Sequence, residues 1–256
     1  MEIPKKIHQT WYKKELPSSI QQKVNRIKSL HKNYQYYFYD DKDILNYIDE
    51  NYDSRILKAY KKLFIGASKA DYFRYLVLYK EGGIYLDLDS DIVKNIDPLI
   101  ENKSGVISRE GNKPYFLQWM MCFCKGHPIL KKIIDITTDN ILENKSKEVL
   151  FLTGPRGPYT QGINDLIKIK NLWDKKDSEI NEELKNNEDD MLKNTVFYGI
   201  DYEEYAKYKC ENNLELYSGV LTWRAKQDLY NNRYLILISS LFLILVIYKL
   251  VKLKLK

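Results

Sequence analysis

One stretch of the sequence, residues 67–91, restricts most strongly what this chain can fold into. It reads ASKADYFRYLVLYKEGGIYLDLDSD, and its first half has residues that recur at steps of three and four, which predicts a helix. The residues expected on one side of that helix are Ala67, Ala70, Arg74, Val77 and Leu78. Gly82 and Gly83 then end it, because glycine readily adopts the left-handed conformation of helix ends. A short strand, Ile84–Asp89, is expected to follow directly.

The end of this predicted strand carries two carboxylates, Asp87 and Asp89. Side chains alternate along a strand, so both are expected on the same face as Tyr85. Neighbouring carboxylates repel each other unless a cation lies between them and a ligand. Oxygen ligands suit Mg²⁺ or Mn²⁺, with phosphate oxygens completing the coordination shell. The alternative is a solvated acidic turn, but the glycine pair and the apolar strand before the motif favour the metal site.

The stretch closely resembles the DXD core of glycosyltransferase family 32, which includes fungal α-1,6-mannosyltransferases and inositol-phosphoceramide mannosyltransferases. The glucosyltransferase domains of large clostridial toxins are similar over the same stretch. The resemblance runs from Ile3 to about Pro158 and is strongest in Ile3–Trp11 and Ala67–Pro98. It implies an α/β fold with a GT-A-type, Rossmann-like nucleotide-sugar-binding domain and a retaining sugar transfer.

The resemblance also implies roles for residues of the motif and the helix before it. Asp89 would bind Mn²⁺ or Mg²⁺ directly, and Asp87 would bind the metal through water, or the ribose. Tyr85 precedes them on the same face as a donor-binding candidate. Asp71 and Arg74 are three positions apart, so both can face one ligand, and their counterparts hold the donor sugar. The alternative for this pair is a local ion pair on an exposed helix.

Two tryptophans are further donor-binding candidates. Trp11 ends the segment that resembles the family's opening strand, where the aromatic residue stacks on the nucleotide base; an ordinary core tryptophan is the alternative. Trp223 ends Tyr217–Trp223 (YSGVLTW), which lies where relatives carry a His-containing segment ending in Ser-Trp. Trp223 would close over the donor, but the absent His and the Thr222-Trp223 ending leave the role of this segment open.

The N-terminal residues predict a strand–helix–strand unit. Ile3–Trp11 is expected to be a strand, and Ser19–His31 a helix that opens with a capping box after Pro17. Tyr34–Tyr39 is expected to be the second strand, so the unit should be right-handed with parallel strands. Such sheets bind ligands beyond the carboxyl ends of their strands, where Trp11, Asp40 and Asp87 would lie. Asp40 is equally suited to cap a helix at Asp43–Ile48.

Other positions favour structural roles. His8 is expected to be packed within its strand, and Asp91 is expected to support the metal site from behind at most. Lys125–Pro128 resembles a Gly-His-Pro turn of the family that opens a helix at Ile129. Thr153-Gly154-Pro155 resembles a family turn near the acceptor, where glycine would allow a ligand to approach closely. The charged residues 174–194 are expected to form a solvated helix or a mobile loop.

Composition limits the partners. The net charge is +6, but four lysines lie among the last eight residues, and without them the charge is +2. A nucleic-acid-binding domain would need a concentrated basic face, which the remaining sequence does not show. The three cysteines, Cys122, Cys124 and Cys210, have neither disulfide-like nor zinc-like spacing and are expected to be free thiols. We therefore expect one catalytic domain at residues 1–230, followed by a separate segment at 231–256.

Within that last segment, Tyr234–Val251 reads YLILISSLFLILVIYKLV and contains a single charge. Eighteen helical residues span about 27 Å, close to the roughly 30 Å hydrocarbon core of a bilayer. We expect a single C-terminal membrane anchor with a basic tail, the alternative being a buried helix. The basic tail favours a cytoplasmic C-terminus, whereas the lack of a visible signal peptide favours a cytoplasmic catalytic domain, and the second expectation is preferred.

The sequence thus predicts a metal-dependent transferase that moves a sugar from a UDP- or GDP-sugar to a hydroxyl of a glycan or glycolipid. A membrane protein that binds nucleotide-sugars but has lost transfer is the main alternative, and donor binding without product would reveal it. A metal-dependent phosphohydrolase would need more acidic or histidine ligands near Asp87. A membrane-tethered interaction module would use residues 174–194 as its contact surface.

Overall fold

The computed structural model describes residues 2–111, 113–200, 202, 204–208 and 223–232. The chain divides into two units, Met1–Ser218 and Gly219–Lys256. The strands of the first unit are β1 (Lys6–Thr10), β2 (Gln35–Tyr39), β3 (Gly83–Leu86), β4 (Asp91–Ile92), β5 (Gly105–Arg109), β6 (Met120–Phe123), β7 (Thr195–Ile200) and β8 (Ala206–Lys207).

The helices of the first unit connect these strands. They are α1 (Ser18–Leu30), α2 (Asp41–Asn51), α3 (Ser54–Lys62), α4 (Gly66–Glu81), α5 (Asp97–Ile100), α6 (Pro128–Leu142), α7 (Val149–Leu152), η1 (Pro155–Tyr159, kinked at Gly157), α8 (Thr160–Ile167), η2 (Leu172–Asp174), α9 (Asp177–Leu184) and α10 (Asp190–Lys193). The second unit contributes α11 (Trp223–Asn231) to the described residues.

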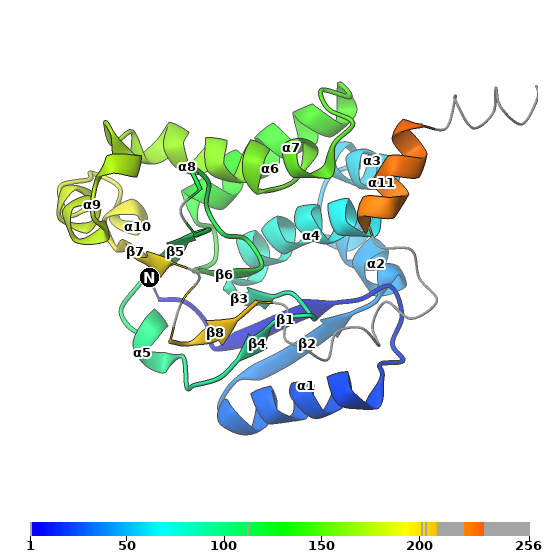
Figure 1. Cartoon of the computed structure of the whole chain (residues 1–256), viewed down its shortest axis with the longest axis horizontal. Helices are drawn as coiled ribbons and strands as arrows, with labels where there is room; N and C mark the ends of the chain where they lie inside the picture. Colours follow the sequence, from blue (N-terminus) through cyan, green and yellow to red (C-terminus); the bar gives the residue numbers. More distant parts are fainter. Residues whose placement is uncertain (1, 112, 201, 203, 209–222, 233–256) are drawn as a thin grey trace, which may run out of the picture. The chain divides into compact units, whose positions relative to one another are not determined.

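A mixed six-stranded sheet, ordered β2-β1-β3-β6-β5-β7, forms the centre of the first unit. β1 runs parallel to both β2 and β3, and β5 runs parallel to β7, whereas β6 is antiparallel to its neighbours β3 and β5. Helix α1 lies on one face of this sheet, and α4 and α6 lie on the other (Figure 1). The predicted strand–helix–strand unit with parallel strands is confirmed, and the domain is a three-layered α/β structure.

Side chains alternate between the two faces along the central strands, so each strand contributes apolar residues to both cores. Tyr85, Met121 and Phe123 face the larger cluster, which contains α4 and α6. Ile84 and Cys122 face the other cluster, which contains Ile27 of α1. Both faces of the sheet are therefore apolar and covered, as expected of a sheet with helices on either side.

Helix α4 is buried on nearly all sides, which the sequence pattern did not indicate. Its residues from Asp71 to Leu78 are all buried, including Tyr72, Phe73, Tyr75 and Leu76 outside the predicted apolar side. The helix ends where predicted: Gly82 has φ +65° and Gly83 has φ +104°. A Cβ atom on Gly83 would lie 2.6 Å from the Lys6 carbonyl oxygen, so glycine also allows β3 to approach β1 closely.

Several local expectations were wrong. Helix α1 has Pro17 at its N-cap with no side-chain cap, so the capping box expected there is absent. The capping box lies instead at α2, where the Asp40 carboxylate accepts hydrogen bonds from Lys42 N and Asp43 N. Asp40 is thus a helix cap.

Residues 174–194 are helical over much of their length and carry an exposed charged face, but they are not solvated on all sides. They form α9 and α10, and the apolar side chains of Ile180, Leu184 and Leu192 are buried in the larger core. The charged residues occupy the outer face of this segment, which made it look wholly polar in the sequence.

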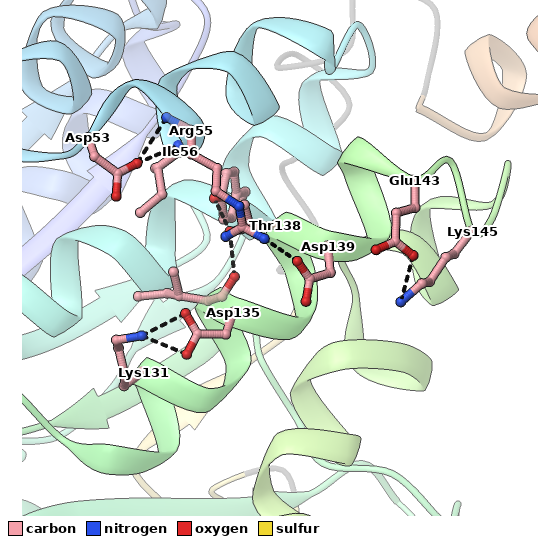
Figure 2. Close-up of polar contacts among 11 residues, drawn as sticks. Asp53, Arg55, Ile56, Lys131, Asp135, Thr138, Asp139, Glu143 and Lys145 are labelled. Carbon is pink, nitrogen blue, oxygen red and sulfur yellow. Dashed lines mark hydrogen bonds and ion pairs between the residues drawn. The ribbon is translucent and has the colours of Figure 1, made fainter.

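Polar contacts join α3 to α6 across the outer layer (Figure 2). Asp53 caps α3 by accepting from Arg55 N at 2.9 Å and Ile56 N at 3.0 Å, and the Arg55 side chain pairs with Asp139 of α6. Lys131 and Asp135 form an ion pair within α6 at 2.6 Å. These side chains are exposed, so they contribute little to stability.

Within the part of the chain that the structure describes, no helix has both the length and the apolar character needed to cross a bilayer. The anchor predicted at Tyr234–Val251 lies outside the described residues, as do Cys210 and most of Tyr217–Trp223. Cys122 and Cys124 are free and buried, as expected.

Candidate active site

The Asp87-x-Asp89 motif lies in a turn directly after β3. The strand ends at Leu86, three residues earlier than predicted, and Ser90 N donates to the Asp87 carbonyl at 2.9 Å to close the turn. Asp87 N donates to the Trp119 carbonyl at 2.7 Å, which fixes the turn against the segment before β6. The Asp87 side chain is 25% exposed, whereas Asp89 is 8% exposed. The motif is therefore a rigid, partly open turn at the carboxyl end of β3.

Arg74 of α4 connects this turn to the helix. Its Nη2 lies 2.9 Å from Asp71 Oδ1 and 3.0 Å from Asp87 Oδ1, and its Nη1 donates to the Gln118 carbonyl at 2.7 Å. Its side chain is only 4% exposed. The pair Asp71–Arg74 is thus buried, and the interpretation as a local ion pair on an exposed helix is wrong.

Asp71 is held by three donors. Oδ1 accepts from Arg74 and from Gln118 Nε2 at 2.8 Å, and Oδ2 accepts from Thr153 Oγ1 at 3.1 Å. Burial raises the pKa of the Asp71 carboxyl, and the charge of Arg74 followed by the hydrogen bonds from Thr153 and Gln118 pull that pKa back down. The carboxylate is therefore fixed in one orientation.

The ring of Tyr85 packs against the guanidinium group of Arg74. The guanidinium carbon of Arg74 lies 4.7 Å from the centre of the Tyr85 ring, and the Tyr85 hydroxyl is 2.9 Å from Thr10 Oγ1 on β1. Tyr85 is 1% exposed. In this structure Tyr85 supports the arginine from below, so its direct contact with a donor stays a prediction.

Trp11 and Asp87 follow two parallel strands at the same edge of the sheet. β1 ends at Thr10 and β3 at Leu86, and Trp11 N donates to the Tyr39 carbonyl at 3.1 Å. The half-buried Trp11 ring packs against the cluster of Ile20, Val24 and Leu88. Since Leu88 is the middle residue of the motif, the tryptophan lies beside the acidic turn at the edge where such sheets bind ligands.

The acidic turn has unusual electrostatics. Burial raises the pKa of Asp87 to about 7; Arg74 opposes this shift, while Asp89 and then Asp71 add to it. Burial disfavours the charge of Arg74, but Asp87, Tyr85 and Asp71 outweigh it and raise the pKa of the guanidinium. Arg74 contacts Asp71 and Asp87, and the charge of Asp89 acts on Asp87, so the turn brings together carboxylates of the kind that bind divalent cations.

The donor set fits a magnesium or manganese ion that is shared with a ligand. Asp87 and Asp89 offer carboxylate oxygens from one turn, and Mg²⁺ is commonly bound through one or two carboxylates together with phosphates and waters. Among the described residues there is no group of three or more His, Cys, Asp or Glu side chains that could hold a metal. Phosphate oxygens of a bound nucleotide, together with waters, would complete the shell.

Two residues of this site, Gln118 and Tyr75, were not found in the sequence, and Thr153 was noted only as part of a turn near the acceptor. Gln118 precedes β6, and Thr153 follows α7, so both reach Asp71 from distant parts of the chain. Tyr75 lies one turn after Asp71 in α4, and its hydroxyl is 2.5 Å from Gln118 Oε1 and 2.7 Å from the Thr153 carbonyl. No local pattern marks such contacts, because they depend on how the sheet and the helices assemble.

Tyr208 was also not predicted. It stacks on Trp119 with ring centres 5.5 Å apart, and burial followed by the charges of Asp87 and Asp89 raises the pKa of its hydroxyl. Tyr208 is 48% exposed, so it offers an aromatic ring near the acidic turn. The side chain of Trp223, the other aromatic candidate, lies outside the described residues.

Two polar residues near the site have structural partners instead. Burial lowers the pKa of His8 to about 4, so its ring is neutral and lies 3.0 Å from the Gly82 carbonyl and 3.2 Å from the Tyr39 hydroxyl. Asp91 lies in β4 and pairs with Arg26 of α1. His8 is packed within its strand as predicted, and Asp91 faces the opposite helix layer.

The acidic turn lies in a region of the chain that matches a known protein family. Residues 17–105 match the family described as "Glycosyltransferase sugar-binding region containing DXD motif", and the match includes Asp71, Arg74, Tyr85, Asp87 and Asp89. The similarity to that family covers this part of the chain. Trp11 lies before the matched region, and Gln118 and Thr153 lie after it.

Two curated fungal proteins illustrate the similarity. Inositol phosphoceramide mannosyltransferase 3 of Schizosaccharomyces pombe is 35% identical over 132 residues, which cover 52% of this chain and 36% of that protein. Initiation-specific alpha-1,6-mannosyltransferase of Candida albicans is 29% identical over 202 residues, which cover 63% of this chain and 52% of that protein. The chain therefore spans about a third to a half of the length of these relatives.

A solved structure supports the fold assignment. The PaToxG glycosyltransferase superposes with a TM-score of 0.55 at 24% sequence identity, covering 70% of this chain and 73% of that structure. At this identity the likeness concerns the fold alone. The sugar-transferase α/β fold expected from the sequence is confirmed.

Proposed function

We propose that this chain is a metal-dependent glycosyltransferase that moves mannose from a nucleotide-sugar to a hydroxyl of a glycan or glycolipid acceptor. The proposal rests on the cluster of site residues within the region that matches the DXD family. It also rests on two similar proteins, an inositol phosphoceramide mannosyltransferase and an initiation-specific alpha-1,6-mannosyltransferase. GDP-mannose is the donor to test first, and UDP-sugars are the comparison.

One observation carries the proposal: a single buried arginine bridges two acids, one of which belongs to the metal-binding turn. Arg74 Nη2 contacts both Asp71 and Asp87 at 2.9 and 3.0 Å. Asp87 is thereby aligned with Asp89 on one side and with Asp71 on the other. A metal site and a sugar-binding carboxylate are thus joined by one guanidinium, as a nucleotide-sugar that spans both would require.

Each residue then has a distinct task. Asp87 and Asp89 would hold Mn²⁺ or Mg²⁺, which when bound offsets the charge that develops on the departing diphosphate. Arg74 holds the Asp87 carboxylate in place, and its charge opposes the rise in pKa that burial causes. Trp11 would stack on the base, at the edge where β1 ends.

Asp71 would accept a hydrogen bond from a hydroxyl of the donor sugar. Its three donors fix the carboxylate, so it is suited to orientation and poorly suited to attack on carbon. Asp87 is likewise held by Arg74. We therefore propose that the acceptor hydroxyl attacks from the face that the diphosphate leaves, which retains the configuration of the sugar.

The proposal is tested by incubating the full chain with GDP-mannose and a panel of UDP-sugars, with and without Mn²⁺, and by measuring both donor binding and transfer. Asp89→Asn removes one of the two carboxylates and should abolish Mn²⁺-dependent binding and transfer, while its unfolding temperature stays near that of the wild type. Asp135→Asn, at an exposed ion pair of α6, is the matched control and should behave as the wild type (Figure 2).

Two outcomes would contradict the proposal. Full transfer by Asp89→Asn in Mn²⁺ would show that the acidic turn is not the metal site. Donor binding by the wild type without any product, over a broad range of acceptors, would favour a nucleotide-sugar-binding protein that has lost transfer.

A further inference from the structure

We propose that Gln118 is a positioning residue that determines which oxygen of Asp71 is presented to the donor sugar. The inference rests on the proposed function, and it concerns a residue outside the family region at 17–105. Gln118 contacts both members of the buried pair: its side chain donates to Asp71, and its main-chain carbonyl accepts from Arg74.

The amide of Gln118 is held at both ends. Nε2 donates to Asp71 Oδ1 at 2.8 Å, and Oε1 lies 2.5 Å from the hydroxyl of Tyr75. A carboxylate only accepts hydrogen bonds, so the nitrogen must face Asp71, and the amide has one orientation. Burial raises the pKa of Tyr75 well above its usual value, so the phenol keeps the proton that it donates.

The support behind this amide is rigid. Tyr75 is fully buried and stacks on Tyr159, with ring centres 6.0 Å apart and an angle of 8° between the ring planes. Its hydroxyl also lies 2.7 Å from the carbonyl of Thr153, the residue whose side chain contacts Asp71. Tyr75, Gln118 and Thr153 thus form one connected set of contacts around Asp71.

The hydrogen bonds leave the two oxygens of Asp71 unequal. A carboxylate oxygen accepts about two hydrogen bonds. Oδ1 already receives Arg74 and Gln118, whereas Oδ2 receives Thr153 alone. A sugar hydroxyl can therefore bind to Oδ2 without displacing a protein donor, and Gln118 is what keeps Oδ1 occupied and the carboxylate from rotating.

Replacement of Gln118 by methionine tests this inference, because methionine has a similar length and cannot donate to Asp71. We expect kcat/KM for GDP-mannose to fall at least tenfold, which equals about 1.4 kcal/mol of transition-state binding. The affinity for GDP with Mn²⁺ should change less than about twofold, since GDP lacks the mannose that would contact Asp71. A residue that only supported the fold would affect GDP and GDP-mannose alike.

A second variant makes the test independent of how well methionine is tolerated. Tyr75→Phe removes the hydroxyl that contacts both the Gln118 amide and the Thr153 carbonyl, so it should lower kcat/KM in the same direction, with GDP affinity again unchanged. In the Asp71→Asn background, Gln118→Met should add little further loss, because both changes act through the same carboxylate.

The outcomes separate this inference from the proposed function. If the wild type transfers mannose while Gln118→Met and Tyr75→Phe both keep full kcat/KM, Gln118 has no positioning role and the transferase assignment stands. Equal losses for GDP and GDP-mannose would also overturn the inference. If the wild type neither binds nor uses any nucleotide-sugar, the proposed function fails and this inference fails with it.

Discussion

Arg74 makes its polar contacts from the interior of α4, and their geometry determines what a substitution there should do. Nε donates to the Ala70 carbonyl at 3.3 Å, while the two terminal nitrogens contact Gln118, Asp71 and Asp87. A planar guanidinium can meet these acceptors at once, whereas the single ammonium of lysine cannot. Buried acids that lose their partner are strongly destabilising.

We therefore expect Arg74→Lys to lower transfer at least about tenfold and also to lower the unfolding temperature by several degrees. Arg55→Lys is the matched control, because Arg55 pairs with Asp139 on the surface and its side chain is 51% exposed (Figure 2). The control should change neither quantity measurably. Steady-state kinetics and thermal unfolding of both variants would decide this, and a harmless Arg74→Lys would contradict the bridging role.

The residues of the site differ in how far the sequence could reveal them. Asp87, Asp89, Asp71 and Arg74 share one short stretch, and the resemblance of that stretch to a known DXD core assigned Asp71 and Arg74 to the site. Gln118 reaches Asp71 from 47 positions away, and its role depends on the antiparallel pairing of β3 with β6. That pairing has no signal in the sequence, so neither did the contact.

At the scale of the elements, the junction of α4 and β3 is the most constrained point of the chain. Gly82 and Gly83 both have positive φ, and a Cβ atom on Gly83 would lie 2.6 Å from the Lys6 carbonyl oxygen and 2.9 Å from Lys6 Cβ. Alanine there would suffer both the backbone strain and a clash with β1, which pairs with β3.

Gly83→Ala should therefore destabilise the protein by more than about 2 kcal/mol. Gly126→Ala separates the two causes, because Gly126 has φ +75° but open space around its Cα atom. That control should cost only about 1 kcal/mol, the usual strain of a non-glycine residue in this region. Chemical denaturation gives both values, and equal losses would show that the close approach of β3 to β1 contributes nothing.

The elements also show that a local sequence pattern fails to predict structure where the packing of distant residues determines it. The helix, the glycine pair and the start of β3 were predicted correctly, because their signals are local. The predicted strand continued to Asp89, whereas the hydrogen bond from Ser90 N to the Asp87 carbonyl turns the chain after Leu86. Residues 174–194 looked solvated because few apolar residues occur among many charges, yet those few, such as Ile180 and Leu184, are buried in the core.

For the whole molecule, buried histidines make stability depend on pH. Burial lowers the pKa of His8 to about 4 and that of His127 to about 3, whereas an unfolded chain would have values near 6.5. The unfolded state therefore binds more protons below pH 6.5. The stabilisation from neutral His8 is fully present above that pH and is lost as the pH falls towards 4.

His8→Gln should reduce this acid-induced loss by about 3 kcal/mol between pH 6.5 and 4, because glutamine does not titrate and can still donate to the Gly82 carbonyl. Comparison of the two proteins cancels the opposite contribution of Asp87, whose pKa burial raises. Denaturant unfolding at several pH values measures the difference, and parallel pH profiles for both proteins would contradict the assignment to His8.

Membrane attachment is a further question for the whole chain, and it concerns the residues that follow the described part of the structure. We propose that Tyr234–Val251, with one charge in eighteen residues and a basic tail, anchors the protein in a bilayer. The first unit, Met1–Ser218, contains the sheet, both cores and the candidate site around Asp87. The full chain should therefore float with phospholipid vesicles, while a chain that ends at Asn232 should stay in the aqueous fraction and keep its Mn²⁺-dependent affinity for GDP. Aggregation of the shortened chain with loss of GDP binding would instead identify the segment as a buried helix of the catalytic domain.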